Sequence, residues 1–202
     1  MPYDLTLEKA IEAFLEKDPA AMARAAGCAY SPEKGVIETA YMARPYSINC
    51  ADGQTLPLGH DRPLRQDAHI LVLHNLVAAT GRQLTGKLVS FRELPRGGSG
   101  YYPAFKKRAI DPLTKTFGTD PGRMLRALGP LSCEQAAHGD AALLIRVLPR
   151  LPVIYAVWAG DDELSPSGTV LFDSSACDYL PTEDIAVAAG SGAYEIIKAA
   201  SI

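Results

Sequence analysis

The sequence predicts one α+β domain in which an antiparallel or mixed sheet packs against helices. Three observations carry this prediction: a strongly apolar helix at residues 65–80, several β-prone runs in the last third of the chain, and no regular alternation of strands with helices. The chain has 202 residues, which suits a single domain (1–202) with a sizeable core. Within it we expect an N-terminal helical segment at 1–30 and an α+β core at 35–200.

The helices are predicted from apolar periodicity and from chain breakers. Residues 4–26 indicate one or two helices, because apolar residues recur there at helical spacing and Pro19 suits the first turn of a second helix. The helix at 65–80 is apolar nearly all round and is expected at the centre of the core. Further helices are predicted at 103–117, at 121–128 and from Thr182, a candidate N-cap, towards the C-terminus.

Short β-prone runs predict the strands. A hairpin or meander is expected at residues 35–58, where Asp52-Gly53 is a strong turn signal. Further strands are expected at 88–91, 142–148, 153–158 and 169–172.

Bulk properties exclude some classes of function. The net charge of −3 does not favour nucleic acid as a partner, and the longest apolar run is too short to span a bilayer. Four widely spaced cysteines favour neither a zinc site nor an iron–sulfur cluster. Because the chain also shows no secretory signal, we expect reduced thiols and a cytoplasmic location.

A basic, glycine-rich segment at residues 92–108 is the first candidate binding site. Its glycines at 97, 98 and 100 predict a loop whose backbone N–H groups turn towards a ligand. Cationic side chains would pair with carboxylates or phosphate, and aromatic rings would stack on a planar group. The candidates are Arg92, Arg96, Lys106, Tyr101, Tyr102 and Phe105. The alternative interpretation is a mobile surface turn followed by the basic face of a helix.

Histidines and carboxylates supply the other candidates. His74 lies on an apolar helix face and is either an axial ligand to a cofactor metal, a general base, or a core histidine bonded to backbone. His138 and Asp173 are candidate catalytic residues. Asp162, Glu163 and Asp173, in the acidic stretch 160–184, are candidate ligands for Mg²⁺ or Ca²⁺. The alternatives here are a solvated turn and the acidic first turn of a helix.

Several motifs, in order along the chain, resemble the family catalogued as domain of unknown function 3786. They cover about residues 65–190 and include Leu73-His74-Asn75-Leu76, Leu88-Val89-Ser90-Phe91-Arg92-Glu93-Leu94-Pro95, Tyr101-Tyr102-Pro103-Ala104-Phe105 and Gly160-Asp161-Asp162-Glu163. The resemblance implies a prokaryotic protein of anaerobic metabolism, in a one-carbon or tetrapyrrole setting. Some members resemble fusions to a cysteine-rich iron–sulfur segment, which this chain lacks, so no cluster is predicted.

Three hypotheses follow. The first is a protein that binds a planar anionic ligand or cofactor such as a tetrapyrrole (haem or corrinoid), with His74 as axial ligand and the basic segment holding the acidic groups. The second is an enzyme that uses carboxylates, with or without a divalent metal. The third is an accessory or scaffold protein with a protein partner or a second copy of itself.

Overall fold

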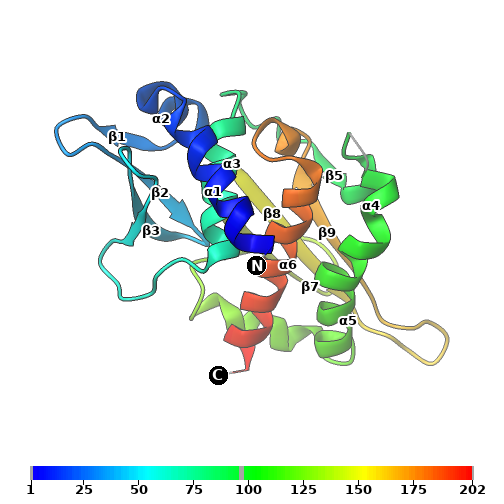
Figure 1. Ribbon diagram of the computed structural model, residues 1–202. Helices are drawn as coiled ribbons and strands as arrows, with labels where there is room; N and C mark the ends of the chain where they lie inside the picture. The colour runs from blue at the N-terminus through cyan, green and yellow to red at the C-terminus, as the bar shows by residue number, and fades with distance from the viewer. Residues whose placement is uncertain (1, 96–97, 202) are drawn as a thin grey trace.

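The centre of the molecule is a five-stranded antiparallel sheet whose strands lie in the order β5-β9-β8-β7-β6 (Figure 1). The computed structural model describes residues 2–95 and 98–201. β-Branched and other apolar residues fill the two long central strands, as suits strands inside a sheet. The strands are β5 Leu88–Ser90, β6 Glu134–Gln135, β7 Ala141–Leu148, β8 Leu151–Trp158 and β9 Ser167–Asp173.

A smaller antiparallel sheet of four strands, in the order β1-β2-β3-β4, lies beside it. Alternate residues on its two longer strands are buried, as expected for strands with one face on the core. Ile37 pairs with Ile48, and Thr39 with Tyr46, and all four are buried. The strands are β1 Ala29–Ser31, β2 Val36–Tyr41, β3 Arg44–Asn49 and β4 Thr55–Pro57.

Helices cover one face of the larger sheet (Figure 1). The last helix packs on β7, α5 packs on β8 and β9, and α1 packs on α3. The helices are α1 Pro2–Leu15, α2 Pro19–Ala26, α3 Gln66–Ala78, α4 Gly98–Phe105, α5 Asp111–Phe117 and α6 Thr182–Ala200, with a π-helical turn η2 Lys106–Ile110 and short 3-10 segments η1 Phe91–Glu93, η3 Pro121–Leu128 and η4 Ala176–Asp178. None of these described helices is long and apolar enough to cross a membrane.

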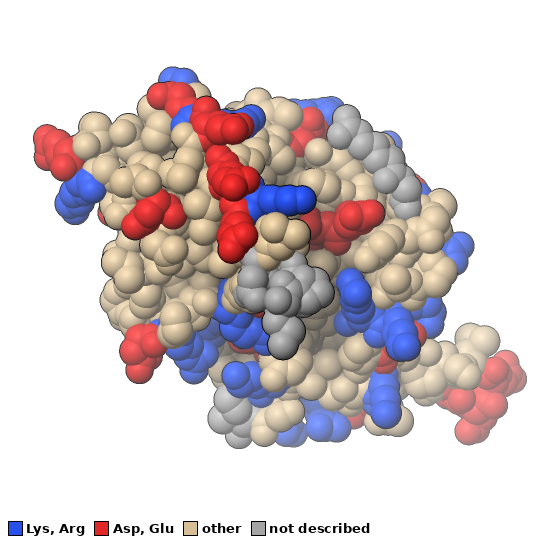
Figure 2. All heavy atoms as spheres, viewed as in Figure 1, with Lys and Arg blue, Asp and Glu red and all other residues tan. Residues whose placement is uncertain are grey.

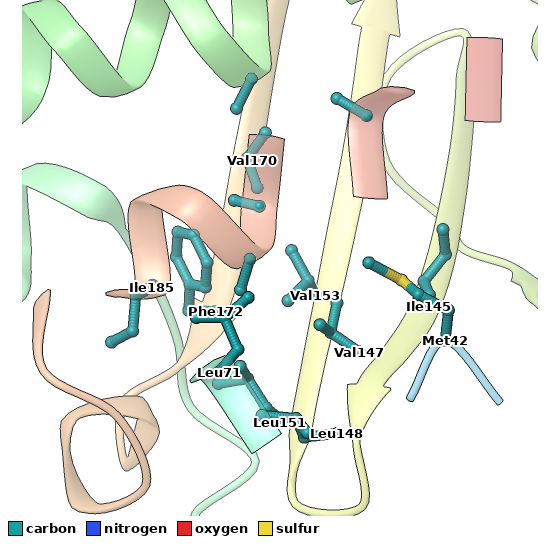
Figure 3. Close-up of a cluster of buried hydrophobic side chains, with 14 of the residues drawn as sticks. Met42, Leu71, Ile145, Val147, Leu148, Leu151, Val153, Val170, Phe172 and Ile185 are labelled. Carbon is teal, nitrogen blue, oxygen red and sulfur yellow. The ribbon is translucent and has the colours of Figure 1, made fainter. Parts of the chain in front are cut away.

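The hydrophobic core lies between the larger sheet and these helices (Figure 3). Figure 3 shows Leu71 of α3, Val153 of β8, Phe172 of β9 and Ile185 of α6 together in it. All four are at most 1% exposed. Burying each such side chain is worth about 1.5–3 kcal/mol, so this cluster is a main source of stability.

Helix α6 approaches the sheet closely because its buried face is built from small residues. The Tyr155 hydroxyl of β8 donates a hydrogen bond of 3.1 Å to the carbonyl of Ala189. A Cβ at Gly192 would overlap the Tyr155 ring, so glycine is needed there. This contact sets the distance between α6 and the sheet.

The strained two-residue turn between β2 and β3 contacts the larger sheet. Met42 and Ala43, which link β2 to β3, have φ angles of +50° and +60°, in the left-handed region that favours glycine. The Met42 N–H donates to the Val147 carbonyl of β7 at 3.0 Å, and the buried Met42 side chain lies beside Ile145 (Figure 3). The small sheet is therefore held to the large one at this turn.

The structure confirms the predicted α+β class, with both sheets antiparallel, and corrects two details. The predicted glycine-rich loop is helical from Gly98 onwards, since a Cβ at Gly98 would overlap the Phe91 carbonyl and glycine lets α4 lie against η1. The meander expected at 35–58 is confirmed: the Asp52-Gly53 turn leads from β3 to β4, and the β2–β3 hairpin turns at Met42-Ala43. Pro181 is the N-cap of α6, and the Thr182 hydroxyl donates to the Pro95 carbonyl instead.

Replacing Ala43 with glycine is expected to stabilise the protein by up to about 1 kcal/mol, because glycine has no Cβ to strain at positive φ. Urea unfolding at neutral pH measures the change. The matched control is Ala40→Gly within β2, where glycine should destabilise by about 0.5–1 kcal/mol. A loss of stability in Ala43→Gly as large as in the control would contradict the strain.

Candidate functional site

A groove of about 1010 Å³ lies between the small sheet and α6. The β2–β3 hairpin, the loop that leads into α3, and the outward face of α6 form its walls, and Arg108 of η2 lies at its edge. We call this the α6 groove. Its volume is at the upper end of the range, about 300–1,000 Å³, that ligand sites in proteins occupy.

Positive charge dominates the α6 groove although the whole chain is acidic. Five cationic side chains line it against three carboxylates: Arg44, Arg62, Arg65, Arg108 and Lys198 against Asp61, Asp67 and Glu195. Figure 2 shows Lys and Arg gathered on the lower part of this face, whereas Asp and Glu follow α1 above. The groove therefore attracts anions locally, against the net charge of −3.

Only part of this positive charge is neutralised by ion pairs within the protein. Arg65 makes a two-point pair with Asp67, at 3.1 and 2.6 Å, and Arg44 lies 3.7 Å from Glu195. The Arg65 pair outweighs the effect of burial on Asp67 and lowers the pKa of that carboxyl. Within the described part of the chain, three groove cations have no ion-pair partner: Arg62, Arg108 and Lys198.

Hydrogen bonds hold the loop that carries Arg62 in place. The Tyr46 hydroxyl donates to the Arg62 carbonyl at 3.1 Å, and the Arg62 N–H donates to His60 Nδ1 at 3.3 Å. His60 Nε2 donates to the Pro45 carbonyl at 3.0 Å, which fits the tautomer that these contacts require. The backbone at Arg62 is thus ordered before any ligand arrives.

The hydroxyl groups of Tyr41 and Ser191 place uncharged polar atoms in the α6 groove. Burial raises the pKa of Tyr41 to about 12, although a hydrogen bond with Ser191 lowers it in part. The Tyr41 phenol is therefore protonated at neutral pH and can donate a hydrogen bond. At the edge of the groove, the ring of Tyr194 is 55% exposed and offers a flat apolar surface.

Arg108 reaches the α6 groove from an unusual stretch of backbone. It lies in the π-helical turn η2, which follows Pro103 of α4. Gly190 of α6 lies against Arg108, so η2 packs on the middle of α6 at this point. π-Helical turns are rare and frequently occur at functional sites.

His74 and Asp184 form a second polar feature close to the α6 groove. His74 Nδ1 lies 2.7 Å from Asp184 Oδ2, and the two side chains are 31% and 20% exposed. No described residue bonds His74 Nε2. Among the described residues, His138 Nδ1 is the one buried side-chain atom without a hydrogen-bond partner. His74 Nε2 is therefore not a buried atom. Nε2 is therefore reachable from solvent, and both the axial-ligand and the general-base roles need this atom.

The candidates at 92–106 contact each other and the core. Phe105 is 1% exposed and stacks on Phe91 with ring centroids 4.0 Å apart, so its ring is a core ring. The Arg92 guanidinium lies 3.9 Å above the Tyr102 ring, Tyr101 is half-buried, and Lys106 forms an ion pair with Asp111. Arg96 lies outside the described residues. The structure thus gives these side chains intramolecular partners and a packing role.

Asp173 is buried at 4% exposure and accepts five hydrogen bonds of 2.6–3.1 Å. The donors are the backbone and hydroxyl of Thr85, the backbone of Gly86, and the backbone and hydroxyl of Ser175. Burial by itself raises the pKa of Asp173, but the bonds from Ser175 and Thr85 outweigh it and lower the pKa to about 2. This carboxylate joins the loop before β5 to the turn after β9.

The predicted metal ligands do not meet. Asp162 and Glu163 are exposed in the β8–β9 turn, which Figure 2 shows as an acidic projection, whereas Asp173 ends β9 about 20 Å away along the strand. His138 lies near the start of β7, at the end of the sheet away from Asp173. Across residues 2–95 and 98–201 no group of three or more His, Cys, Asp or Glu side chains could hold a metal ion.

Comparison with known proteins gives a family. The model of a family described as a domain of unknown function, DUF3786, matches residues 18–194. The chain belongs to this family. The match begins well before residue 65, so the β1–β4 sheet and the first wall of the α6 groove are part of the DUF3786 domain. No curated protein and no solved structure matched the chain.

Sequence reasoning missed the α6 groove of this DUF3786 domain. Its cations come from segments that are far apart in the chain, at 44, 62–65, 108 and 198, and no local motif connects them. One available signal was the helical spacing of Ser191, Tyr194, Glu195 and Lys198, which gives α6 a polar face of its own.

Asp173→Asn is expected to lower the free energy of unfolding by about 2 kcal/mol at pH 7. An amide nitrogen in place of Oδ2 cannot accept the bond from the Gly86 N–H, and the remaining oxygen accepts the bonds from Thr85 and Ser175 without a negative charge. The folded pKa lies below the unfolded one, so the wild-type contribution is complete above pH ~4 and disappears as the pH falls towards 2. Urea unfolding at pH 7, 4 and 2.5 measures the difference between the two proteins. Asp162→Asn, at an exposed site, is the control. A difference that does not shrink at low pH would contradict this account of Asp173.

Proposed function

We propose that the protein binds a planar anionic small molecule in the α6 groove. The observation that carries the proposal is the set of three groove cations, Arg62, Arg108 and Lys198, that find no ion-pair partner among the described residues. Such groups are stabilised by a ligand that brings carboxylates or phosphate, since bonds between charged partners are about twice as strong as neutral ones.

The positions of the cations favour a ligand with more than one acidic group. Arg62 comes from the loop before α3, whereas Arg108 and Lys198 come from η2 and the end of α6. Because they belong to different walls, a molecule that reaches all three spans the groove. The fixed backbone of Arg62 lowers the entropy lost on binding.

Aromatic and hydroxyl groups favour a ring between the acidic groups. Tyr194 offers an exposed ring at the edge, and the neutral Tyr41 hydroxyl can donate to a polar atom of the ligand. A tetrapyrrole, the ligand expected from the sequence, is a large member of this class, with carboxylates on a flat ring. Its proposed site moves from the 92–106 segment to the α6 groove.

Coproporphyrin III, a soluble planar ring with four carboxylates, is a direct probe. We expect it to bind, with the affinity reduced about tenfold by Arg62→Ala, Arg108→Ala or Lys198→Ala, because each change removes a charge-assisted bond worth about 1.5 kcal/mol. Fluorescence titration measures the affinity. Binding should also weaken as salt is raised from 50 to 500 mM, because the groove is open to screening ions.

Two exposed cations outside the groove supply matched controls, Lys34→Ala and Arg126→Ala. Each removes one positive charge, so an effect of net charge alone would weaken binding equally in controls and groove variants. Inorganic pyrophosphate, an anion without a ring, should bind more weakly than the porphyrin. Equal affinities in all five variants, or no binding of the porphyrin to the wild-type protein, would reject the proposal.

A further inference from the structure

The pair of His74 and Asp184 stands apart from the groove cations but lies on two helices that also line the α6 groove. Asp67 of α3 and Ser191 of α6 both line the α6 groove. His74 is seven residues after Asp67, and Asp184 is seven residues before Ser191, so each pair shares one helix face two turns apart. The two helices therefore carry the polar pair at one end and the groove at the other, about 10 Å apart.

The α6 groove extends towards this pair. Val187, which also lines the groove, is less than one helical turn from Asp184. A ligand held by Arg108, which packs beside Gly190 of α6, and long enough to pass Val187, would bring its other end to His74. Gly190 is six residues from Asp184 along α6, about 9 Å, a distance that an organic anion of moderate length and the Arg108 side chain cover together.

The geometry of the pair suits proton transfer. A carboxylate bonded to Nδ1 of a histidine fixes the tautomer and ring orientation, directs the Nε2 lone pair outwards, and stabilises the imidazolium that forms when Nε2 takes a proton. The 2.7 Å contact of Asp184 meets this requirement, and Nε2 is reachable from solvent with no bond to a described residue. Because the stacking ring and cations lie in the groove, the flat part of a ligand is held there and only its far end meets His74.

We propose that His74, oriented by Asp184, is a general base that acts on an elongated organic anion bound in the α6 groove. This inference rests on the proposed function, because the groove supplies the anchor. Nε2 takes a proton from a water molecule or hydroxyl group at the far end of the ligand. The O–H bond breaks, an N–H bond forms, and the oxygen becomes a nucleophile. The proton then passes to the leaving group or to solvent.

The first test measures the reactivity of Nε2 directly. Diethyl pyrocarbonate acylates unprotonated, accessible imidazole nitrogens, and peptide mass spectrometry gives the rate for each histidine. His74 should react faster than His60, whose two ring nitrogens are both bonded within the protein. Asp184→Asn should slow His74 and leave His60 unchanged. A rate for His74 equal to or below that for His60 would overturn the proposal.

The second test measures turnover with the mono-p-nitrophenyl ester of adipic acid, an elongated anion, against neutral p-nitrophenyl acetate. Water attacks the ester carbonyl as His74 takes its proton, and the bond to p-nitrophenolate breaks. We expect the wild-type protein to prefer the anionic ester, and His74→Gln to lose about 100-fold or more of that activity. Asp184→Asn should lower kcat, whereas Arg108→Ala should raise KM with kcat nearly unchanged.

His138→Gln, remote from the groove, is the matched control and should keep the wild-type rate. Circular dichroism and Tm confirm that each variant is folded. If His74→Gln hydrolyses both esters at the wild-type rate while coproporphyrin III still binds, His74 is not the general base, and the proposed binding function is unaffected. If the porphyrin does not bind and the anionic ester is not preferred, the α6 groove does not bind anions, and both proposals are rejected.

Discussion

The arrangement of the molecule depends on the junction at Met42, where a hydrogen bond of 3.0 Å and a buried side chain hold the small sheet to the large one. The turn that presents Met42 has two non-glycine residues at positive φ, a conformation that persists only when its surroundings fix it. Here the bond to Val147 and the contact with the core do so. Together with the contacts of Arg44 with Glu195 and of Tyr41 with Ser191, this junction fixes the position of the β2–β3 hairpin relative to α6.

The α6 groove is a consequence of this junction and of the close packing of α6. The hairpin brings Tyr41 and Arg44 to one wall, and the Tyr155–Gly192 contact fixes the helix that forms the other. Arg108 joins them because the π-helical turn packs against α6 at Gly190. The cations of the groove are thus positioned by packing, and three of them are left without a described partner. Because it is a hollow with more cationic than acidic side chains, the α6 groove is the part of the described molecule best suited to bind an anion.

Much of the fold could be predicted from local pattern. The apolar run of α3 and the β-branched runs of β7 and β8 permit no other placement than the core, and Asp52-Gly53 marks a real turn. The helix at 98–105 could not, because Gly98 serves close packing on Phe91 and not flexibility. The Met42-Ala43 turn carries no turn residues and is imposed by tertiary contact. His74 was found from its helix face, but its partner 110 residues away, like the groove itself, exists only in three dimensions.

The central claim is that the α6 groove, and not the basic segment at 92–106, receives the ligand. Backbone ¹H–¹⁵N NMR with increasing coproporphyrin III tests it most directly. The account predicts chemical-shift changes concentrated at residues 41–46, 61–68, 108 and 187–198, with smaller ones reaching His74 and Asp184. Changes centred on 98–106 or on the β8–β9 turn, with the groove amides unmoved, would contradict it.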